Sequence, residues 1–467
     1  MKARLLIPVA MMALLAGACS TGLEELRAQP DGNAVVIDRS DRPLQPSGPV
    51  GSDDSKPYVE TLELSISAIQ QFWTDAMPGA YGRDFQVIPP EKIFAYSSTV
   101  EPPACGPGPK PTYRDLAGNA FYCTEGGFVA FDDEGLMPQL YENFGSYAVA
   151  MVLAHEWGHA VQDQMGNSNS GAATVLLEQQ ADCFAGAWTK WLGDGNYPQL
   201  PLNEGTLDAA LGGLLEFRDE PGTSSDDPAA HGSGFDRVRA FRDGFGSGVD
   251  ACVDYERNTP PVLQLPFTAG DYETGGNLPY DELATTLFPD LTAWIAREFP
   301  SYVEPTAEEY DPAAGQVVCG STTVSDADAD DRSFYCASDG SVRWDGPWLE
   351  GINNSTGDFA SSLLVGMQYG VALQSQLGES DEQISSEEGV QQRVCLMGAY
   401  AGSLVEEFPV PQQHQLTISG GDLDEALTAL IAFTDSTQTG ATGSSLAFDR
   451  IESFQNGVLE GTSSCGF

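Results

Sequence analysis

The order of apolar and polar residues along the chain predicts several long helices and few strands. The predicted helices lie around Trp73 and Trp294, from about Tyr147 to Met165, over residues 173–192, and around FDRVRAF at 235–241. The apolar stretch GGFVAFDD at 126–133 predicts a strand beside a hairpin bounded by cysteines. The sequence therefore predicts an α+β fold in which helices dominate.

Landmarks of the first half of the chain return in the second half. FYC at 121–123 returns at 334–336, and FDRVRAFRDG at 235–244 returns as FDRIESFQNG at 448–457. Four cysteines have counterparts 212–214 residues later: Cys105, Cys123, Cys183 and Cys252 match Cys319, Cys336, Cys395 and Cys465. This agreement predicts a tandem duplication, with one domain at 57–255 and a repeat of it at 256–467.

A repeated unit should also repeat its disulfides, which reduces the many pairings that eight cysteines allow. The simplest pattern is Cys105–Cys123, Cys183–Cys252, Cys319–Cys336 and Cys395–Cys465. Cys183 lies beside Asp182 and could instead be a thiolate ligand of a metal. Cys395 remains, however, where the other candidate ligands are replaced, and this favours the disulfide.

The first residues have the features of a targeting segment. Lys2 and Arg4 precede an apolar run that is too short to span a bilayer comfortably. LLAGACS at 14–20 resembles a bacterial lipoprotein box ending at Cys19, the cysteine left over from the eight that match. We expect a signal peptide at 1–19, lipidation at Cys19, a flexible linker at 20–56, and an exported protein anchored to the membrane. Ordinary signal cleavage after Ala18, giving a secreted protein, is the alternative.

Composition limits the possible partners of the chain. A hydrophobic content of 41% in 467 residues is typical of folded structure with room for two domains. The net charge of −47 argues against a nucleic-acid partner, because phosphates require a basic surface. The charge does not identify a substrate.

HEWGH at 155–159 has the arrangement of a zinc site. His155 and His159 are four residues apart and project from the same face of a helix, close enough to bind one Zn²⁺. Glu156 adjoins them and can reach a water activated by the ion without binding the ion itself. The chain contains four histidines in total, so two incidental histidines at this spacing are improbable.

The next predicted helix offers a third ligand, which a catalytic zinc requires. Glu178 and Asp182 are four residues apart on one helix face, nineteen and twenty-three residues after His159. Glu178 would complete a His₂Glu ligand set, and Asp182 could accept a hydrogen bond from a ligand imidazole. The alternative is an acidic face exposed to solvent, which is common in so acidic a chain.

HEWGHAVQDQ, LEQQADCFAGAW and HGSGFDRVRAFRDGF resemble three blocks of the bacterial neutral zinc metallopeptidases. The resemblance covers residues about 57–255 and implies one Zn²⁺ per chain, a zincin-like catalytic lobe, Glu156 as general base, and a protein or peptide substrate. We expect His231, in the third block, to stabilise the oxyanion. The strand at 126–133 could pair with an extended substrate, or lie inside the sheet.

The second half lacks this chemistry. His155, Glu156, His159, Glu178, Asp182 and His231 correspond to Met367, Gln368, Val371, Val390, Val394 and Ser444. The repeat is therefore expected to be a degenerate, metal-free lobe that packs on the catalytic lobe, or alternatively binds substrate or regulates activity.

The leading interpretation is an exported, lipid-anchored zinc metallopeptidase. The alternatives are a zinc amidase that acts on cell-wall peptides and a non-catalytic scaffold lipoprotein that binds zinc. Structural zinc sites normally have four protein ligands, whereas this sequence offers three and an unused Glu156.

Overall fold

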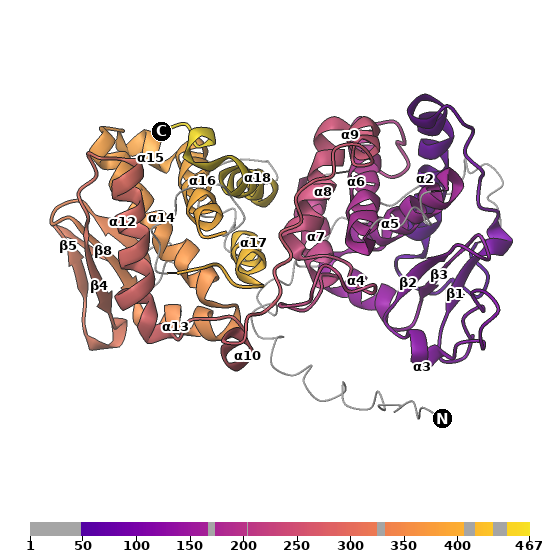
Figure 1. Ribbon diagram of the computed structural model, residues 1–467, viewed down its shortest axis with the longest axis horizontal. Coiled ribbons are helices and arrows are strands. Elements are labelled where there is room, and N and C mark those ends of the chain that lie inside the picture. The colour runs from indigo at the N-terminus through magenta and orange to yellow at the C-terminus, as the bar shows by residue number, and fades with distance from the viewer. Residues whose placement is uncertain (1–47, 167–172, 203, 325–331, 406–415, 433–445) are drawn as a thin grey trace.

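The computed structural model describes residues 48–467, except 167–172, 203, 325–331, 406–415 and 433–445. Cys19, the segment 1–19, most of the linker 20–56, and Ser444 therefore lie outside the described residues. Each half of the chain forms its own lobe, and the two lobes lie side by side (Figure 1). Helices dominate both lobes, which confirms the predicted α+β class.

The first lobe combines one small sheet with a group of helices. Its elements are α2 (Val59–Tyr81), β1 (Ile93–Tyr96), α3 (Tyr113–Leu116), β2 (Ala120–Cys123), β3 (Phe128–Asp132), α4 (Leu136–Phe144), α5 (Ser146–Met165), α6 (Thr174–Gly193), α7 (Glu204–Glu216), α8 (Gly234–Ser247) and α9 (Val249–Asp254). The helices predicted at 147–165 and 173–192 are confirmed within one residue at each end. Gly166 ends α5 with a φ of 81°, a left-handed conformation that favours glycine.

The strand order decides between the two possibilities that the sequence left open for residues 126–133. The sheet has the order β1-β3-β2, with β3 parallel to β1 and antiparallel to β2. All five residues of β3 are buried. Because both edges of β3 are already paired, the strand predicted at 126–133 cannot add a substrate strand. β1 and β2 are the two edge strands, and the outer edge of β1 is bridged by Val50, whereas among the described residues β2 pairs only with β3.

The second lobe has a sheet with the same strand directions. Its longer elements are α12 (Phe288–Glu298), β4 (Thr306–Tyr310), β5 (Val317–Cys319), β6 (Thr322–Val324), β7 (Ser333–Cys336), β8 (Ser341–Asp345), α13 (Gly346–Ser355), α14 (Asp358–Leu377), α15 (Asp381–Ser385), α16 (Glu387–Ser403), α17 (Asp422–Ala432) and α18 (Leu446–Glu460). The short helices α10 (Asp271–Thr274) and α11 (Tyr280–Glu282) precede them. β8 is central, parallel to β4 and antiparallel to β7. The duplication itself remains an inference from the sequence.

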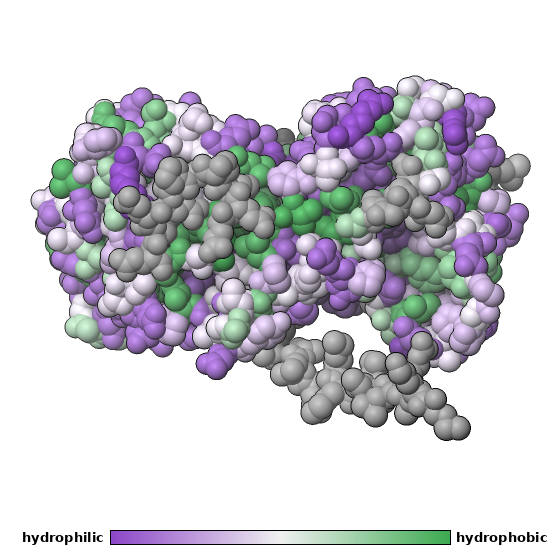
Figure 2. All heavy atoms as spheres, viewed as in Figure 1, coloured by the Kyte–Doolittle hydropathy of each residue, from purple (hydrophilic) through white to green (hydrophobic). Residues whose placement is uncertain are grey.

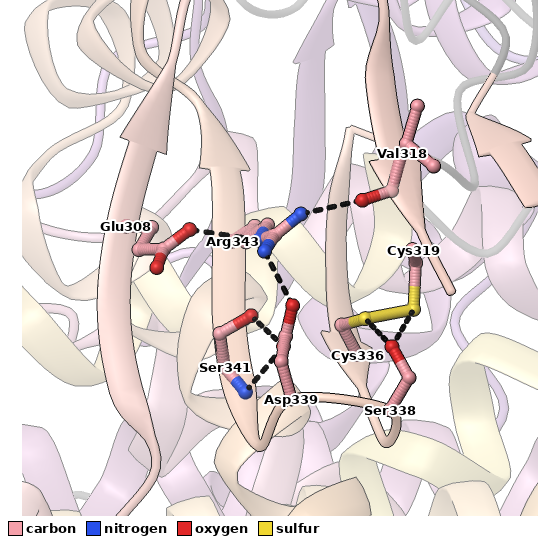
Figure 3. The surroundings of a disulfide bond; sticks show 8 residues. All are labelled: Glu308, Val318, Cys319, Cys336, Ser338, Asp339, Ser341 and Arg343. Atoms are coloured by element: carbon pink, nitrogen blue, oxygen red, sulfur yellow. Dashed lines mark hydrogen bonds and ion pairs between the residues drawn. A yellow bond between two sulfur atoms is a disulfide. The ribbon is translucent and has the colours of Figure 1, made fainter. Parts of the chain in front are cut away.

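Four disulfides join the cysteines in the pattern expected for a repeated unit: Cys105–Cys123, Cys183–Cys252, Cys319–Cys336 and Cys395–Cys465. Figure 3 shows the third of these, which links β5 to β7. Arg343 on β8 reaches Glu308 on β4 and the carbonyl oxygen of Val318 on β5 (Figure 3). The β5–β6 hairpin is thereby fastened to the main sheet.

The lobes contact each other through α7 and α8 on one side and α17 and α18 on the other (Figure 1). Phe245 on α8 meets Phe448 on α18 with ring centroids 5.0 Å apart, and Arg242 lies over the Phe448 ring. Figure 2 shows apolar residues gathered between the lobes, and mostly hydrophilic residues on the outer faces. Within the described part of the chain, no helix is both long and apolar enough to cross a membrane.

Candidate zinc site

Close packing of α5 against α6 brings the predicted ligands together. α5 buries Trp157 and Val161 completely in the core. Between its two histidines, Gly158 faces Ala181 of α6, and a Cβ at position 158 would lie 2.9 Å from the Ala181 Cα. Only glycine permits this approach, which sets the imidazoles of α5 opposite the carboxylates of α6.

His155, His159 and Glu178 form a compact triangle of potential ligand atoms. The two Nε2 atoms are 3.1 Å apart. The Glu178 carboxylate lies 3.1 Å from His155 Nε2 and 3.4 Å from His159 Nε2. The structure thus brings together the three residues that the sequence singled out as ligands.

The other ring nitrogens fix which atoms face the centre of the triangle. His155 Nδ1 lies 2.7 Å from an Asp182 carboxylate oxygen, which can only accept, so Nδ1 donates. His159 Nδ1 lies 2.9 Å from Gln162 Oε1 and donates in the same way. Two Nε2 lone pairs and one carboxylate therefore converge, three acceptors with no donor of their own. Such a group requires a cation or a proton between its members.

The size of the triangle fits zinc. Zinc binds imidazole nitrogen and carboxylate oxygen at about 2.0–2.2 Å, and tetrahedral ligands at that distance are about 3.3–3.6 Å from one another. The two Nε2 atoms are 3.1 Å apart, His155 Nε2 is 3.1 Å from Glu178 Oε2, and His159 Nε2 is 3.4 Å from Glu178 Oε1, all close to this spacing. Three nitrogen and oxygen ligands that leave one corner open are typical of catalytic rather than structural zinc.

The surrounding charges favour a cation at this point. Burial alone would lower the pKa of His155, but Asp182 and Glu178 raise it to about 10. Burial would raise the pKa of Glu178, but the two imidazoles hold it well below the usual range. The buried carboxylates thus attract positive charge into the triangle, which is the role that a metal ion would fill.

Glu156 lies beside the triangle without belonging to it. Its side chain is buried and lines the same cavity as the three potential ligands. Burial raises the pKa of Glu156, while His155, His159 and the backbone of Tyr122 act in the opposite direction. A raised pKa suits a carboxylate that must accept a proton near neutral pH and release it again.

A cavity of about 470 Å³ opens beside these residues. Its walls include residues 118–122 at and before the β2 edge, together with parts of α5, α6 and α7. The volume is in the range of small-molecule and peptide-binding sites. Glu156 and the three potential ligands can thus be reached from the cavity.

Comparison with known proteins agrees with this geometry. A model of the family described as "Putative neutral zinc metallopeptidase" matches residues 7–255, more than half of the 467-residue chain. The chain belongs to this family. An uncharacterized protein of Mycobacterium tuberculosis is 26% identical over 219 residues, which cover 42% of this chain and 70% of that protein. The uncharacterized protein YpfJ of Escherichia coli is 31% identical over 153 residues, covering 28% of this chain and 52% of YpfJ. No solved structure matches the chain.

In this family member, Asp182 is held by an arginine to which the sequence analysis assigned no role. Arg237 on α8 donates from Nε and Nη2 to the Asp182 carboxylate, at 2.9 and 3.0 Å. Its Nη1 donates to the Phe217 carbonyl oxygen at 2.6 Å. Both members of the pair are buried. Arg237 thereby fixes the carboxylate that orients His155.

The packing of α8 on α6 explains how Arg237 reaches this position. A Cβ at Gly186 of α6 would overlap the Phe241 carbonyl of α8, and a Cβ at Gly244 of α8 would overlap the Cys183 carbonyl of α6. Two glycines therefore let the helix backbones touch. The sequence signal was present in FDRVRAF, but spacing alone does not show which of its side chains points inward.

Gln162 is a second residue to which no role was assigned. Besides accepting from His159, it donates from Nε2 to the Leu177 carbonyl at 2.7 Å and to Gln180 Oε1 at 3.1 Å. It thus orients one imidazole and also joins α5 to α6. Its position three residues after His159, on the same helix face, was the available signal.

His231 lies at the rim of the cavity, and 57% of its side chain is exposed. Its backbone N–H donates to the Asp219 carboxylate at 2.9 Å, and its Nδ1 lies 3.5 Å from the same group. Burial would raise the pKa of Asp219, but hydrogen bonds from His231, Gly232 and Gln264 lower it to about 2. The loop is held firmly, while the imidazole borders the cavity.

Proposed function

We propose that the protein is a zinc-dependent metallopeptidase that hydrolyses peptide bonds in proteins or peptides, with one Zn²⁺ per chain. One observation carries this proposal: two imidazoles and one carboxylate with zinc spacing lie next to a second carboxylate outside the triangle, Glu156, in an open cavity. A structural zinc site normally has four protein ligands, so it has neither an open corner nor a neighbouring carboxylate outside the ligand set.

His155, His159 and Glu178 would hold the ion, and Asp182 and Gln162 would orient the imidazoles. Bound zinc would polarise a peptide carbonyl and make a water molecule more acidic. Glu156 would accept the proton of the attacking water and deliver it to the leaving amine. Its buried position keeps it close to the reacting atoms, and its raised pKa makes it a stronger base toward the proton of the attacking water.

Substrate binding is proposed along β2, because β3 is enclosed within the sheet. An extended peptide could add to the β2 edge by backbone hydrogen bonds, which give weak sequence preference. His231 is the proposed oxyanion donor, supported by its place at the cavity rim and its anchored backbone. Four disulfides support an oxidising compartment outside the cytoplasm, and attachment through a lipid on Cys19 remains our proposal.

The test compares two variants with a control in the second lobe. Glu156→Gln should bind one zinc ion and fold normally, yet lose at least a hundredfold of its activity on an unfolded protein. His155→Ala should lose the zinc. Gln368→Ala, at the aligned position of the second lobe, should leave activity unchanged. Full activity of Glu156→Gln would refute the mechanism. Release of peptides from cell-wall material in preference to protein cleavage would instead favour the amidase.

A further inference from the structure

A second group of carboxylates lies far from the zinc site in the sequence, in the other lobe. Asp358 begins α14, while Asp422 and Glu425 lie in the first turn of α17. One oxygen from each side chain lies within 4.8 Å of the other two. Asp358 and Asp422 are only 4% and 6% exposed. None of the three belongs to the proposed zinc site.

Backbone and hydroxyl groups hold each carboxylate in place. Asp358 Oδ2 accepts from the Leu278 N–H at 2.7 Å, and Glu425 Oε2 accepts from the Phe359 N–H at 3.0 Å. Asp422 accepts from the backbone and the hydroxyl of Ser419. The second oxygen of Asp358 is buried and has no hydrogen-bond partner among the described residues. A buried acceptor without a partner points to a ligand.

No basic side chain in the described part of the chain pairs with Asp358, Asp422 or Glu425. Burial is the main reason why the pKa of Asp358 rises to about 6, and the pKa values of the other two rise well above their usual range. The N-termini of α14 and α17 contribute only partial positive charge, less than three carboxylates require. Three carboxylates with oxygens within 4.8 Å of one another and no basic partner among the described residues repel each other, so the cluster must take up protons or bind a cation.

We propose that Asp358, Asp422 and Glu425 form a site for Ca²⁺. The ligand atoms are all oxygens, which hard cations prefer, whereas the zinc triangle contains two imidazole nitrogens. Ca²⁺ binds oxygen at about 2.3–2.6 Å and can therefore contact atoms up to about 5 Å apart, which includes the observed spread. Water and the remaining carboxylate oxygens would complete the six to eight ligands that Ca²⁺ usually takes.

The contacts around the three carboxylates indicate what a bound ion would stabilise. Leu278, which donates to Asp358, lies between α10 and α11, in the segment that leads into the second lobe. Asp424, which lies between two of the ligands in sequence, accepts hydrogen bonds from the first residues of α8 in the catalytic lobe. A cation here would hold the first turn of α17 and the segment between α10 and α11 together. The expectation of a metal-free second lobe would then apply only to the positions aligned with the zinc ligands.

Native mass spectrometry and calorimetric titration of the zinc-loaded protein with CaCl₂ and MgCl₂ test the proposal. Wild type should bind one Ca²⁺ more tightly than Mg²⁺ and should melt at a higher temperature with Ca²⁺. Asp358→Asn and Glu425→Gln should each weaken Ca²⁺ binding at least tenfold. Glu282→Gln, an exposed acidic residue on α11, should bind like wild type. His155→Ala should lose zinc and keep Ca²⁺, which separates this site from the proposed peptidase.

Two results would overturn the proposal. One is wild type that binds no Ca²⁺ beyond what Asp358→Asn and Glu425→Gln bind. The other is that Ca²⁺ does not change the stability of wild type, while Asp358→Asn is more stable than wild type at pH 7. The carboxylates would then be neutralised by protons alone. If one substitution prevents folding, the other variant and the ion count of wild type still decide the question.

Discussion

Replacing Gln162 with Leu should weaken zinc binding even though Gln162 does not belong to the ligand triangle. Its Oε1 accepts the Nδ1–H of His159 at 2.9 Å and so keeps the Nε2 lone pair directed at the ion. Leucine has a similar volume and no acceptor. The imidazole of Gln162→Leu could then turn, change tautomer, or leave its buried N–H without a partner.

The expected magnitude follows from these contacts. Loss of a residue that orients a metal ligand typically reduces metal affinity about 10- to 100-fold, or about 1.4–2.7 kcal/mol. Gln162 also donates to the Leu177 carbonyl and to Gln180. At about 0.5–1.5 kcal/mol net for each of these bonds, the free energy of unfolding without zinc should fall by about 1–3 kcal/mol.

The second lobe offers a matched control for this substitution. Gln374 on α14 donates to the Gly389 carbonyl at 3.2 Å and to Gln392 Oε1 at 2.8 Å, and thus joins α14 to α16. Its Oε1 accepts from Arg393 at 2.8 Å, where Gln162 accepts from a histidine. Gln374→Leu should therefore lower stability by a comparable amount and leave zinc affinity unchanged.

Competition with a chromophoric chelator gives the zinc affinity, and urea unfolding of the zinc-free variants gives the stability. If Gln162→Leu and Gln374→Leu are destabilised equally but both bind zinc like wild type, the orientation argument is wrong. Gln162 would then serve only to join two helices.

Two further outcomes follow from charges near the site. Arg237→Met leaves the Asp182 carboxylate buried without its cation, so the free energy of unfolding should fall by about 3–5 kcal/mol in urea titrations. Lys190→Met, at the exposed ion pair with Asp194, should change it by less than about 1 kcal/mol. The pKa of Asp219 is lowered to about 2, so its ionised form stabilises the fold above about pH 4 and this contribution is lost as the pH falls toward 2. Asp219→Asn should therefore be about 1–2 kcal/mol less stable than wild type at pH 7 and equally stable near pH 2, as unfolding at the two pH values will show.

Local spacing explains why part of the site was predictable. His155, Glu156 and His159 are fixed by one turn of one helix, and Glu178 needed only a short connection that returns the next helix alongside. Arg237 lies 55 residues beyond Asp182, and its contact depends on how α8 crosses α6. The residues of a helix or strand predict its type. They do not predict which elements pack against it, because that depends on packing across the whole lobe.

The same limit explains why the sequence left two roles open for the strand at 126–133. The apolar stretch at 126–133 correctly predicts a strand, and a continuous apolar run is also typical of a strand that is buried on both faces, as β3 is. The order β1-β3-β2 depends on the parallel pairing of β3 with β1, more than thirty residues earlier. No local pattern encodes that pairing. The edge strand β2 could be named only once the order was known.

The second lobe also contacts α8, the helix whose Arg237 holds Asp182 beside the proposed zinc site. The Asp424 carboxylate accepts from the Gly234 and Phe235 N–H groups at 2.9 and 2.7 Å, at the start of α8. Arg237 follows within the first turn and holds Asp182, which orients His155. A chain of contacts therefore runs from α17 of the second lobe to a proposed ligand in the first.

Asp424→Ala tests whether this chain matters. Loss of two hydrogen bonds to a carboxylate at a helix start should lower the free energy of unfolding by about 2–4 kcal/mol, and a looser α8 should weaken zinc binding by up to about tenfold. Glu452→Gln is the control, because Glu452 also bridges the lobes, to Arg242, but is 49% exposed and far less costly to lose. If Asp424→Ala binds zinc and cleaves protein like Glu452→Gln, the second lobe covers α7 and α8 without supporting the site. If only Asp424→Ala loses affinity, the lobe without zinc chemistry helps to hold the ligands of the other.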